Sequence, residues 1–192
     1  MVILGALFIF LGGFLVYDVL TKKNPDMTVM LLLNDQYFYG STDKLEEILE
    51  EYIEDWNEDG KKIVSVYFMP IDPDNYDQYS QASETKLYAM MQSGTDLLVI
   101  ADSSHDEILR PDAILYDLSA DYPENESVSN YRFNFGGSGL LEDIEYNGNG
   151  GEDMYIGIRK VDNGAKYRDE MQDSFDKFYP VLQQLIEDYS EK

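Results

Sequence analysis

Three short apolar segments lie between residues 28 and 101: TVMLLL (28–33), IVSVYFM (63–69) and LLVIA (97–101). Continuous apolar runs such as the first and third are typical of strands covered on both faces of a parallel sheet, and the β-branched and aromatic residues of the second also predict a strand. The segments between them are long enough for helices, so the order is strand, helix, strand, helix, strand. This alternation predicts a parallel sheet with right-handed crossovers.

Both connecting segments have helical patterns. Between residues 45 and 56, apolar residues recur every three or four positions while glutamates lie largely on the opposite face, and Gly60 ends the segment. The second helix is expected to start at a cap formed by Asn75 and to end at Gly94, because glycine readily adopts the left-handed conformation that closes a helix.

The second half of the chain is less regular. We predict a short strand or turn at 114–118, a polar loop at 122–130, an exposed strand at 131–135 and an antiparallel strand at 154–161. Residues 167–189 have the apolar spacing of a long amphipathic helix. Pro180 lies inside this pattern, so we expect a kink or two helices that meet at Tyr179.

Residues 1–17 (MVILGALFIFLGGFLVY) contain no charged side chain, and the apolar segment closes at Lys22 and Lys23. A run of about 17–25 apolar residues is long enough for a helix to span a bilayer. No small-residue cleavage site follows, so we favour an uncleaved anchor over a signal peptide or a buried core helix. The predicted fold class is therefore an α/β, three-layer single domain at 24–192 with a mainly parallel sheet, preceded by one transmembrane helix at 1–23.

Two features of the sequence give opposite predictions for the side of the membrane on which the soluble domain lies. Lys22 and Lys23 follow the apolar run, and the positive-inside rule would leave the domain in the cytoplasm. Long domains translocate largely regardless of such charges, and the family resemblance given below favours the outer side. We therefore expect a single-pass protein of the cell membrane whose soluble domain is extracytoplasmic.

The composition excludes several classes of protein. The 192 residues hold 38 Asp and Glu against 14 Lys and Arg, a formal net charge of −24, and no cysteine. So large an excess of negative charge excludes binding along the phosphate backbone of a nucleic acid. The absence of cysteine excludes a disulfide framework and a thiol nucleophile. The 16 Tyr and 9 Phe favour a folded domain over a disordered acidic tail.

One segment matches part of a calcium-binding loop. Asp55, Asn57 and Asp59 place oxygen atoms at alternate positions before the glycine of a sharp turn. The twelfth position is Val66 rather than a bidentate glutamate, so we interpret the segment as a polar turn before a strand. Weak calcium binding at these three residues is the alternative, and we expect no other cofactor.

Other polar residues favour structural roles. The acidic group Asp72, Asp74 and Asp77 is expected in a solvated loop with a helix cap. The chain's one histidine, His105, follows Ser103 and Ser104 directly, whereas a catalytic triad is assembled by the fold and is not recognised by adjacency. A carboxylate-based hydrolase is a further hypothesis, but no spacing selects a pair of acids. We therefore expect that the protein is not an enzyme.

The order of elements in residues 28–118 resembles the first lobe of extracellular solute-binding proteins of ABC transporters. TVMLLL is followed by a helix ending in EDWNEDG, then by KKIVSVYFM, and then by a helix that runs into LYAMMQSGTDLLVIAD. The segment ILYDL (114–118) is similar to the family's following G-x-L-x-D-L segment. The pattern also looks like that of small membrane-anchored proteins of Firmicutes with no assigned activity.

The resemblance implies a binding domain. About 75 residues follow Leu118, fewer than a second lobe needs, so the family's closing cleft is not expected. Open parallel sheets bind ligands at the carboxyl ends of their strands, and the residues there are Asn34, Asp35, Ser103 and Ser104, with Pro70 and Ile71 beside them. We expect a non-enzymatic, membrane-anchored, solute-binding-like module for a small molecule of unknown identity. A subunit that docks a basic membrane-protein partner is the alternative.

Overall fold

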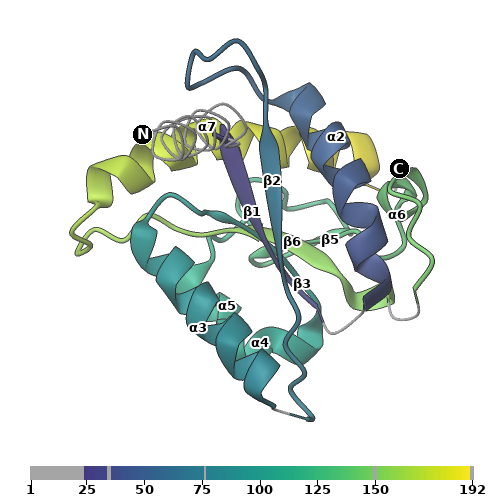
Figure 1. The fold of residues 1–192 in the computed structure, drawn as a ribbon. Coiled ribbons are helices and arrows are strands. Elements are labelled where there is room, and N and C mark those ends of the chain that lie inside the picture. The colour runs from purple at the N-terminus through teal and green to yellow at the C-terminus, as the bar shows by residue number, and fades with distance from the viewer. Residues whose placement is uncertain (1–23, 34–35, 76, 149–150, 191–192) are drawn as a thin grey trace, which may run out of the picture.

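The computed structural model describes residues 24–33, 36–75, 77–148 and 151–190 (Figure 1). These residues form one six-stranded sheet with the strand order β2-β1-β3-β6-β5-β4. The strands are β1 (Met27–Leu32), β2 (Val64–Met69), β3 (Leu98–Ala101), β4 (Val128–Ser129), β5 (Arg132–Asn134) and β6 (Tyr155–Ile158). The α-helices are α2 (Thr42–Tyr52), α3 (Gln78–Ser93), α4 (Asp106–Leu109), α5 (Pro111–Ile114), α6 (Gly139–Asp143) and α7 (Arg168–Tyr189). Three short 3₁₀ helices are η1 (Gln36–Ser41), η2 (Ser103–His105) and η3 (Gly151–Asp153).

The sheet has a parallel half and an antiparallel half. Strand β1 pairs in parallel with both β2 and β3, whereas β6 is antiparallel to β3 and to β5, and β5 is antiparallel to β4. The sheet is therefore mixed, and the expected parallel arrangement holds for β1, β2 and β3 but not for β4, β5 and β6. After β3 the chain returns through short helices and loops instead of long crossover helices, so β6 enters beside β3 in the opposite direction.

Helices cover both faces of the sheet (Figure 1). On one face, Val29 and Leu31 of β1 pack in a buried cluster with side chains of α2 and α7. On the other face, Met30 and Leu32 pack with Leu87 of α3. This alternation along β1 follows from the two-residue period of a strand. The α/β arrangement with helices on both sides of a central sheet agrees with the sequence pattern.

Helix α2 ends earlier than its apolar pattern predicts. It stops at Tyr52, and Ile53 has an extended backbone with φ −92° and ψ 166°. Asp55 accepts hydrogen bonds from the backbone of Asp59 and Gly60, at 3.1 and 2.8 Å, and such local bonds compete with helix continuation. Trp56 still reaches the core, because its ring stacks on Phe178 of α7 with centroids 5.6 Å apart.

Helix α3 begins and ends at two local signals. Its start lies at Asp77 rather than at the expected Asn75, because one oxygen of Asp77 accepts the N–H groups of Tyr79 and Ser80, both at 2.9 Å. Its end at Gly94 is confirmed, and the φ of +80° there is the left-handed conformation that glycine adopts most easily.

Helix α7 runs without interruption through Pro180. The expectation of two helices meeting at Tyr179 is therefore wrong. Pro180 is exposed, while Phe178, Val181 and Leu182 on either side of it are buried against the sheet. Burial on both sides of the proline stabilises the helix against the lost backbone hydrogen bond, which costs about 3 kcal/mol in an isolated helix interior.

The antiparallel half was the least predictable region. Strand β4 lies inside the expected polar loop at 122–130, and helix α6 lies between the two expected strands, where no helix was predicted. Residues 114–118 contribute the end of α5 and a single bridge between Leu115 and Arg159. The expected strand at 131–135 is present as β5, but Phe133 is buried because its side chain packs in the core cluster on one face of the sheet.

In the part of the chain that the structure describes, no helix combines the length and the apolar character needed to cross a bilayer. The expected anchor at 1–23 lies outside the described residues.

Candidate functional site

The carboxyl ends of β1, β2 and β3 meet at one edge of the sheet. The connection after β1 runs to β2 on one side, whereas the chain after β3 continues to the antiparallel strands on the other side. Such a switch point is where open α/β sheets form ligand crevices. Ile71 and the segment after β3 are brought together there, since the His105 imidazole lies 2.9 Å from the Ile71 carbonyl. Asn34 and Asp35 of the predicted site lie outside the described residues.

Asp102 organises the turn that follows β3. One of its carboxylate oxygens accepts the backbone N–H of Ser104 at 2.9 Å and the Ser104 hydroxyl at 2.5 Å. The same oxygen lies 2.8 Å from Nδ1 of His105. The sequence favours this turn because an aspartate directly after a strand can cap a short helix, here η2.

His105 is fully buried and both of its ring nitrogens face oxygen acceptors. Nδ1 faces Asp102 and Nε2 faces the Ile71 carbonyl, so the imidazolium form, which donates from both nitrogens, satisfies both contacts. Burial opposes protonation, but the hydrogen bond and charge of Asp102 outweigh it and raise the pKa of His105 above its ordinary value. Burial likewise opposes ionisation of Asp102, but hydrogen bonds from His105 and Ser104 lower the pKa of its carboxyl.

This arrangement differs from a Ser-His-Asp triad. In a triad the serine and the aspartate contact opposite nitrogens of the imidazole. Here the Ser104 hydroxyl lies 3.1 Å from Nδ1, the nitrogen that Asp102 already contacts. The opposite nitrogen contacts a buried carbonyl and lies away from the Ser104 hydroxyl. The cluster therefore fixes the loop geometry at this edge and gives His105 a positioning role.

A second group of polar contacts continues from this cluster. Asp106 of α4 receives a hydrogen bond from the Arg132 guanidinium of β5 and another from the Tyr155 hydroxyl of β6, the latter at 3.0 Å. The guanidinium lies over the Tyr155 ring, 4.3 Å from its centre. Burial raises the pKa of Tyr155, and the charge of Asp106 adds to the effect. This group joins the antiparallel half of the sheet to the helices that follow β3.

The solvent side of this edge presents hydroxyls and carboxylates. Ser103 and Ser104 are exposed, and the Ser103 hydroxyl donates to the carboxylate of exposed Asp153. The cations His105 and Arg132 are already bonded to carboxylates. We call Ser103, Ser104 and Asp153 the switch-point surface. Its chemistry suits a ligand that donates hydrogen bonds or carries positive charge.

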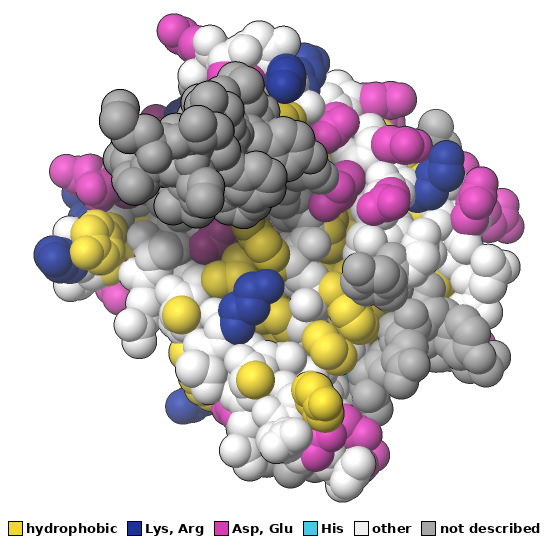
Figure 2. Space-filling view, in the orientation of Figure 1, with side chains coloured by type: hydrophobic (Ala, Val, Ile, Leu, Met, Phe, Trp, Pro, Cys, Tyr) yellow, Lys and Arg dark blue, Asp and Glu magenta, His cyan; other side chains and the backbone are white. Residues whose placement is uncertain are grey.

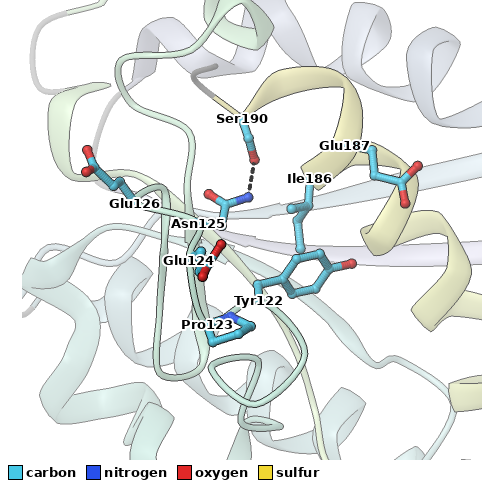
Figure 3. Close-up of a pocket in the computed structure, with 8 residues that line it drawn as sticks. All are labelled: Tyr122, Pro123, Glu124, Asn125, Glu126, Ile186, Glu187 and Ser190. Atoms are coloured by element: carbon cyan, nitrogen blue, oxygen red, sulfur yellow. Dashed lines mark hydrogen bonds between the residues drawn. The ribbon is translucent and has the colours of Figure 1, made fainter.

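A separate open groove lies between the loop before β4 and the end of α7 (Figure 3). It has a volume of about 760 Å³. The ring of Tyr122 and the side chain of Ile186 face its interior, and Asn125 donates a hydrogen bond to the Ser190 hydroxyl at 2.8 Å across it. The remaining lining is Pro123, Glu124, Glu126 and Glu187. The sequence did not indicate this groove, because its two walls are about 60 residues apart in the chain.

The predicted calcium half-loop forms a tight turn. The carboxylate of Asp55 accepts backbone N–H groups of Asp59 and Gly60, and the side-chain oxygen of Asn57 accepts the N–H of Asp59 at 3.0 Å. Asp59 itself accepts the N–H of Lys61 at 3.1 Å. The three predicted ligand oxygens are thus brought into one turn, where they bond to the backbone. Among the described residues, no group of three or more His, Cys, Asp or Glu is placed to hold a metal ion.

The acidic loop before α3 has the expected structural role. Asp72 accepts the N–H groups of Asp74 and Asn75, both at 3.0 Å, and Asp77 caps the helix. The hydrogen bond from the Ser80 backbone is the largest influence that lowers the pKa of Asp77.

The fold and the switch-point surface define an α/β domain with exposed polar side chains at the carboxyl end of β3. No protein-family model, curated protein or solved structure matches the chain.

Proposed function

We propose that this protein is a non-enzymatic binding module, held at the cell membrane by residues 1–23, with an extracytoplasmic domain that binds a small solute. The resemblance of residues 28–118 to solute-binding proteins and the apolar character of residues 1–17 support this proposal. The observation that carries it is the position of the switch-point surface, where the chain leaves β1 and β3 in different directions.

The solute that this surface fits carries amino or hydroxyl groups. The oxygens of Asp153 and the hydroxyl oxygens of Ser103 and Ser104 accept hydrogen bonds from such groups. A net charge of −24 repels anionic solutes and attracts cationic ones. The partly buried pairs His105–Asp102 and Arg132–Asp106 hold the edge in place, so little ordering is needed when a ligand binds.

The test is a thermal-shift series on the full chain at constant ionic strength, with glucose, spermidine, a lysine tripeptide and calcium chloride, and with sodium sulfate as the anionic comparison. A solute at one hundred times its Kd stabilises the folded state by about 2.7 kcal/mol, which raises Tm by about 5–10 °C in a domain of this size. Asp153→Asn is expected to remove most of that shift. The absence of a shift with every non-sulfate probe would contradict the proposal.

A matched control separates binding from loss of charge. Glu170→Gln also removes one negative charge, but Glu170 is exposed in the first turn of α7. That helix begins near the opposite end of the sheet, because β6 runs antiparallel to β3. Glu170→Gln should keep the full ligand-induced shift. Equal losses in the two variants would mean that the shift depends on net charge and not on the switch-point surface.

The groove of Figure 3 supports a second candidate function, a subunit that docks a basic partner. Its glutamates, Glu124, Glu126 and Glu187, surround an aromatic and aliphatic floor, a combination suited to a lysine- or arginine-bearing segment. Co-purification with a membrane protein that is lost in Glu124→Gln/Glu187→Gln and weakened by 0.5 M NaCl would favour this function. Retention of the partner in both conditions would exclude the groove as its docking site.

A further inference from the structure

Strand β2 is the outer strand of the parallel half of the sheet. It pairs with β1 on one side, so the N–H and C=O groups of alternate residues point away from the sheet on the other side. Exposed groups of this kind are a template for pairing with another strand. Whether β2 can pair with another strand therefore depends on which groups already bond to its outward N–H and C=O groups.

Two glutamates of α2 occupy two of them. One carboxylate oxygen of Glu46 accepts the N–H of Val66 at 2.8 Å, and one oxygen of Glu50 accepts the N–H of Val64 at 3.1 Å. These residues are far from β2 in sequence, so the contacts come from the packing of α2 beside the strand. We call the two glutamates and the two amides the glutamate clasp.

The spacing of the clasp matches the spacing of a strand edge. Four residues along an α-helix advance by about 6 Å, and two residues along a strand advance by about 6.6 Å. Glu46 and Glu50, one helical turn apart, can therefore reach the outward amides of Val66 and Val64 in register. Their oxygens take the positions that the carbonyl oxygens of a neighbouring strand would take.

The strand behind the clasp has apolar side chains close to the surface. Val66, Tyr67 and Phe68 are only partly buried, and they line a hollow of about 470 Å³ together with Glu46 and Thr42 of α2. Figure 2 looks onto this side, and hydrophobic side chains lie in the band between α2 and α3, with acidic side chains bordering it toward α2. An apolar edge strand with free amides would favour association.

We propose that the glutamate clasp is an edge guard: it occupies the β2 edge and prevents a second copy of this chain from adding its own β2 in antiparallel pairing. The second copy is the relevant occupant because an outer strand that is apolar on both faces can pair with its symmetry mate about a two-fold axis. The glutamates act as hydrogen-bond acceptors for Val64 and Val66, so the amides that a second strand would need are already occupied.

The test compares association of four forms of the full 192-residue chain by sedimentation in one detergent. Glu46→Ala/Glu50→Ala removes both acceptors, and Glu46→Gln/Glu50→Gln keeps an oxygen acceptor without the charge. Glu47→Ala/Glu51→Ala is the matched control, since these glutamates have the same spacing on the same helix but are exposed. We expect the first variant to dimerise at least tenfold more tightly than wild type, the glutamine variant to stay within threefold, and the control to be unchanged.

Two results would overturn the proposal. One is an equal dimerisation constant in Glu46→Ala/Glu50→Ala and in the control. The other is equally strong association of the glutamine and alanine variants, which would leave charge repulsion alone as the cause.

Hydrogen exchange of the wild-type protein tests the glutamate clasp without any substitution. This test can therefore be made even if a variant fails to fold. The amides of Val64 and Val66 should exchange at least a hundredfold more slowly than unprotected amides, although they face away from β1. Exchange at the unprotected rate in the monomer would contradict the clasp.

Discussion

At the scale of single residues, His105 is a titratable side chain enclosed in the protein interior. It is fully buried, and it bonds to Asp102 and to the Ile71 carbonyl from its two ring nitrogens. Replacement by phenylalanine keeps a ring of similar size but leaves the buried Ile71 carbonyl without its imidazole donor and removes the imidazole from Asp102, which keeps only its bonds from Ser104. We expect His105→Phe to lower the free energy of unfolding by about 3 kcal/mol, the range for breaking a buried pair.

Urea denaturation measures this loss, with Ser104→Ala as the comparison. The Ser104 hydroxyl contacts the same carboxylate but is exposed, so its removal should cost under about 1 kcal/mol. Equal effects of the two substitutions would show that the buried imidazole is not the main stabilising group of this turn.

The same pair predicts how stability depends on pH. The pKa of His105 is raised above its ordinary value of 6.5, so its contribution is complete below that pH and is lost as the pH rises through the raised pKa. The pKa of Asp102 is lowered below 3.8, so its contribution is present above that pH and is lost as the pH falls through the lowered pKa. Asp106 also faces this pair and favours the protonated imidazole.

The stability difference between wild type and His105→Phe should therefore be largest between about pH 4 and 6.5 and should narrow toward pH 9. Urea titrations at one-unit intervals of pH give this difference directly. A difference that stays constant, or that grows above neutral pH, would contradict the charged imidazole.

The sequence predicted the position of part of this candidate site, at the end of β3, but not the contacts that surround it. Ser103 and Ser104 follow a recognisable buried strand, so the rule for carboxyl ends of parallel strands found them. Asp106, Arg132 and Tyr155 come together from three elements that are 23 to 49 residues apart. No local pattern signals such contacts, because they depend on the antiparallel return of the chain.

At the scale of elements, apolar patterns predicted the core strands and the long helices well. They failed where side chains compete with the backbone or where packing overrides propensity. Local hydrogen bonds of Asp55 coincide with the early end of α2, and Asp77 displaces Asn75 as the cap of α3. Strand β4 has only two residues, too few to give any alternation.

Pro180 provides a prediction at this scale. It is exposed in the middle of α7, where the amide hydrogen bond to the preceding turn is missing. Pro180→Ala restores a donor at a solvent-facing position, so we expect a gain of about 1–3 kcal/mol in the free energy of unfolding. The greater flexibility of the unfolded chain reduces the gain but should not reverse it.

Thermal and urea unfolding of Pro180→Ala provide the measurement. Gln184→Ala, at another exposed position of the same helix, is the control and should change stability by less than about 0.5 kcal/mol. A destabilised Pro180→Ala would indicate that α7 is shaped by the proline and that the core requires this shape.

At the scale of the whole molecule, a formal charge of −24 sits on a fold that has well-filled cores on both faces of the sheet. The ion pairs Lys44–Glu47 and Lys177–Asp173 are exposed, and pairs of this kind contribute little to stability. Self-repulsion among the many remaining carboxylates therefore opposes the folded state. The acidic surface serves solubility and repels anions, while stability comes from the apolar layers.

Salt should consequently stabilise this protein. Raising NaCl from 0.01 to 0.1 M shortens the screening length from about 30 to about 10 Å, which weakens repulsion between carboxylates on neighbouring elements more than it weakens contacts within the buried pairs. We expect Tm of the full chain to rise by several degrees over this range and to level off near 0.5 M. A Tm that falls with NaCl would contradict this expectation. It would mean that attractive ion pairs on the surface stabilise the fold more than repulsion among the carboxylates destabilises it, despite the formal net charge of −24.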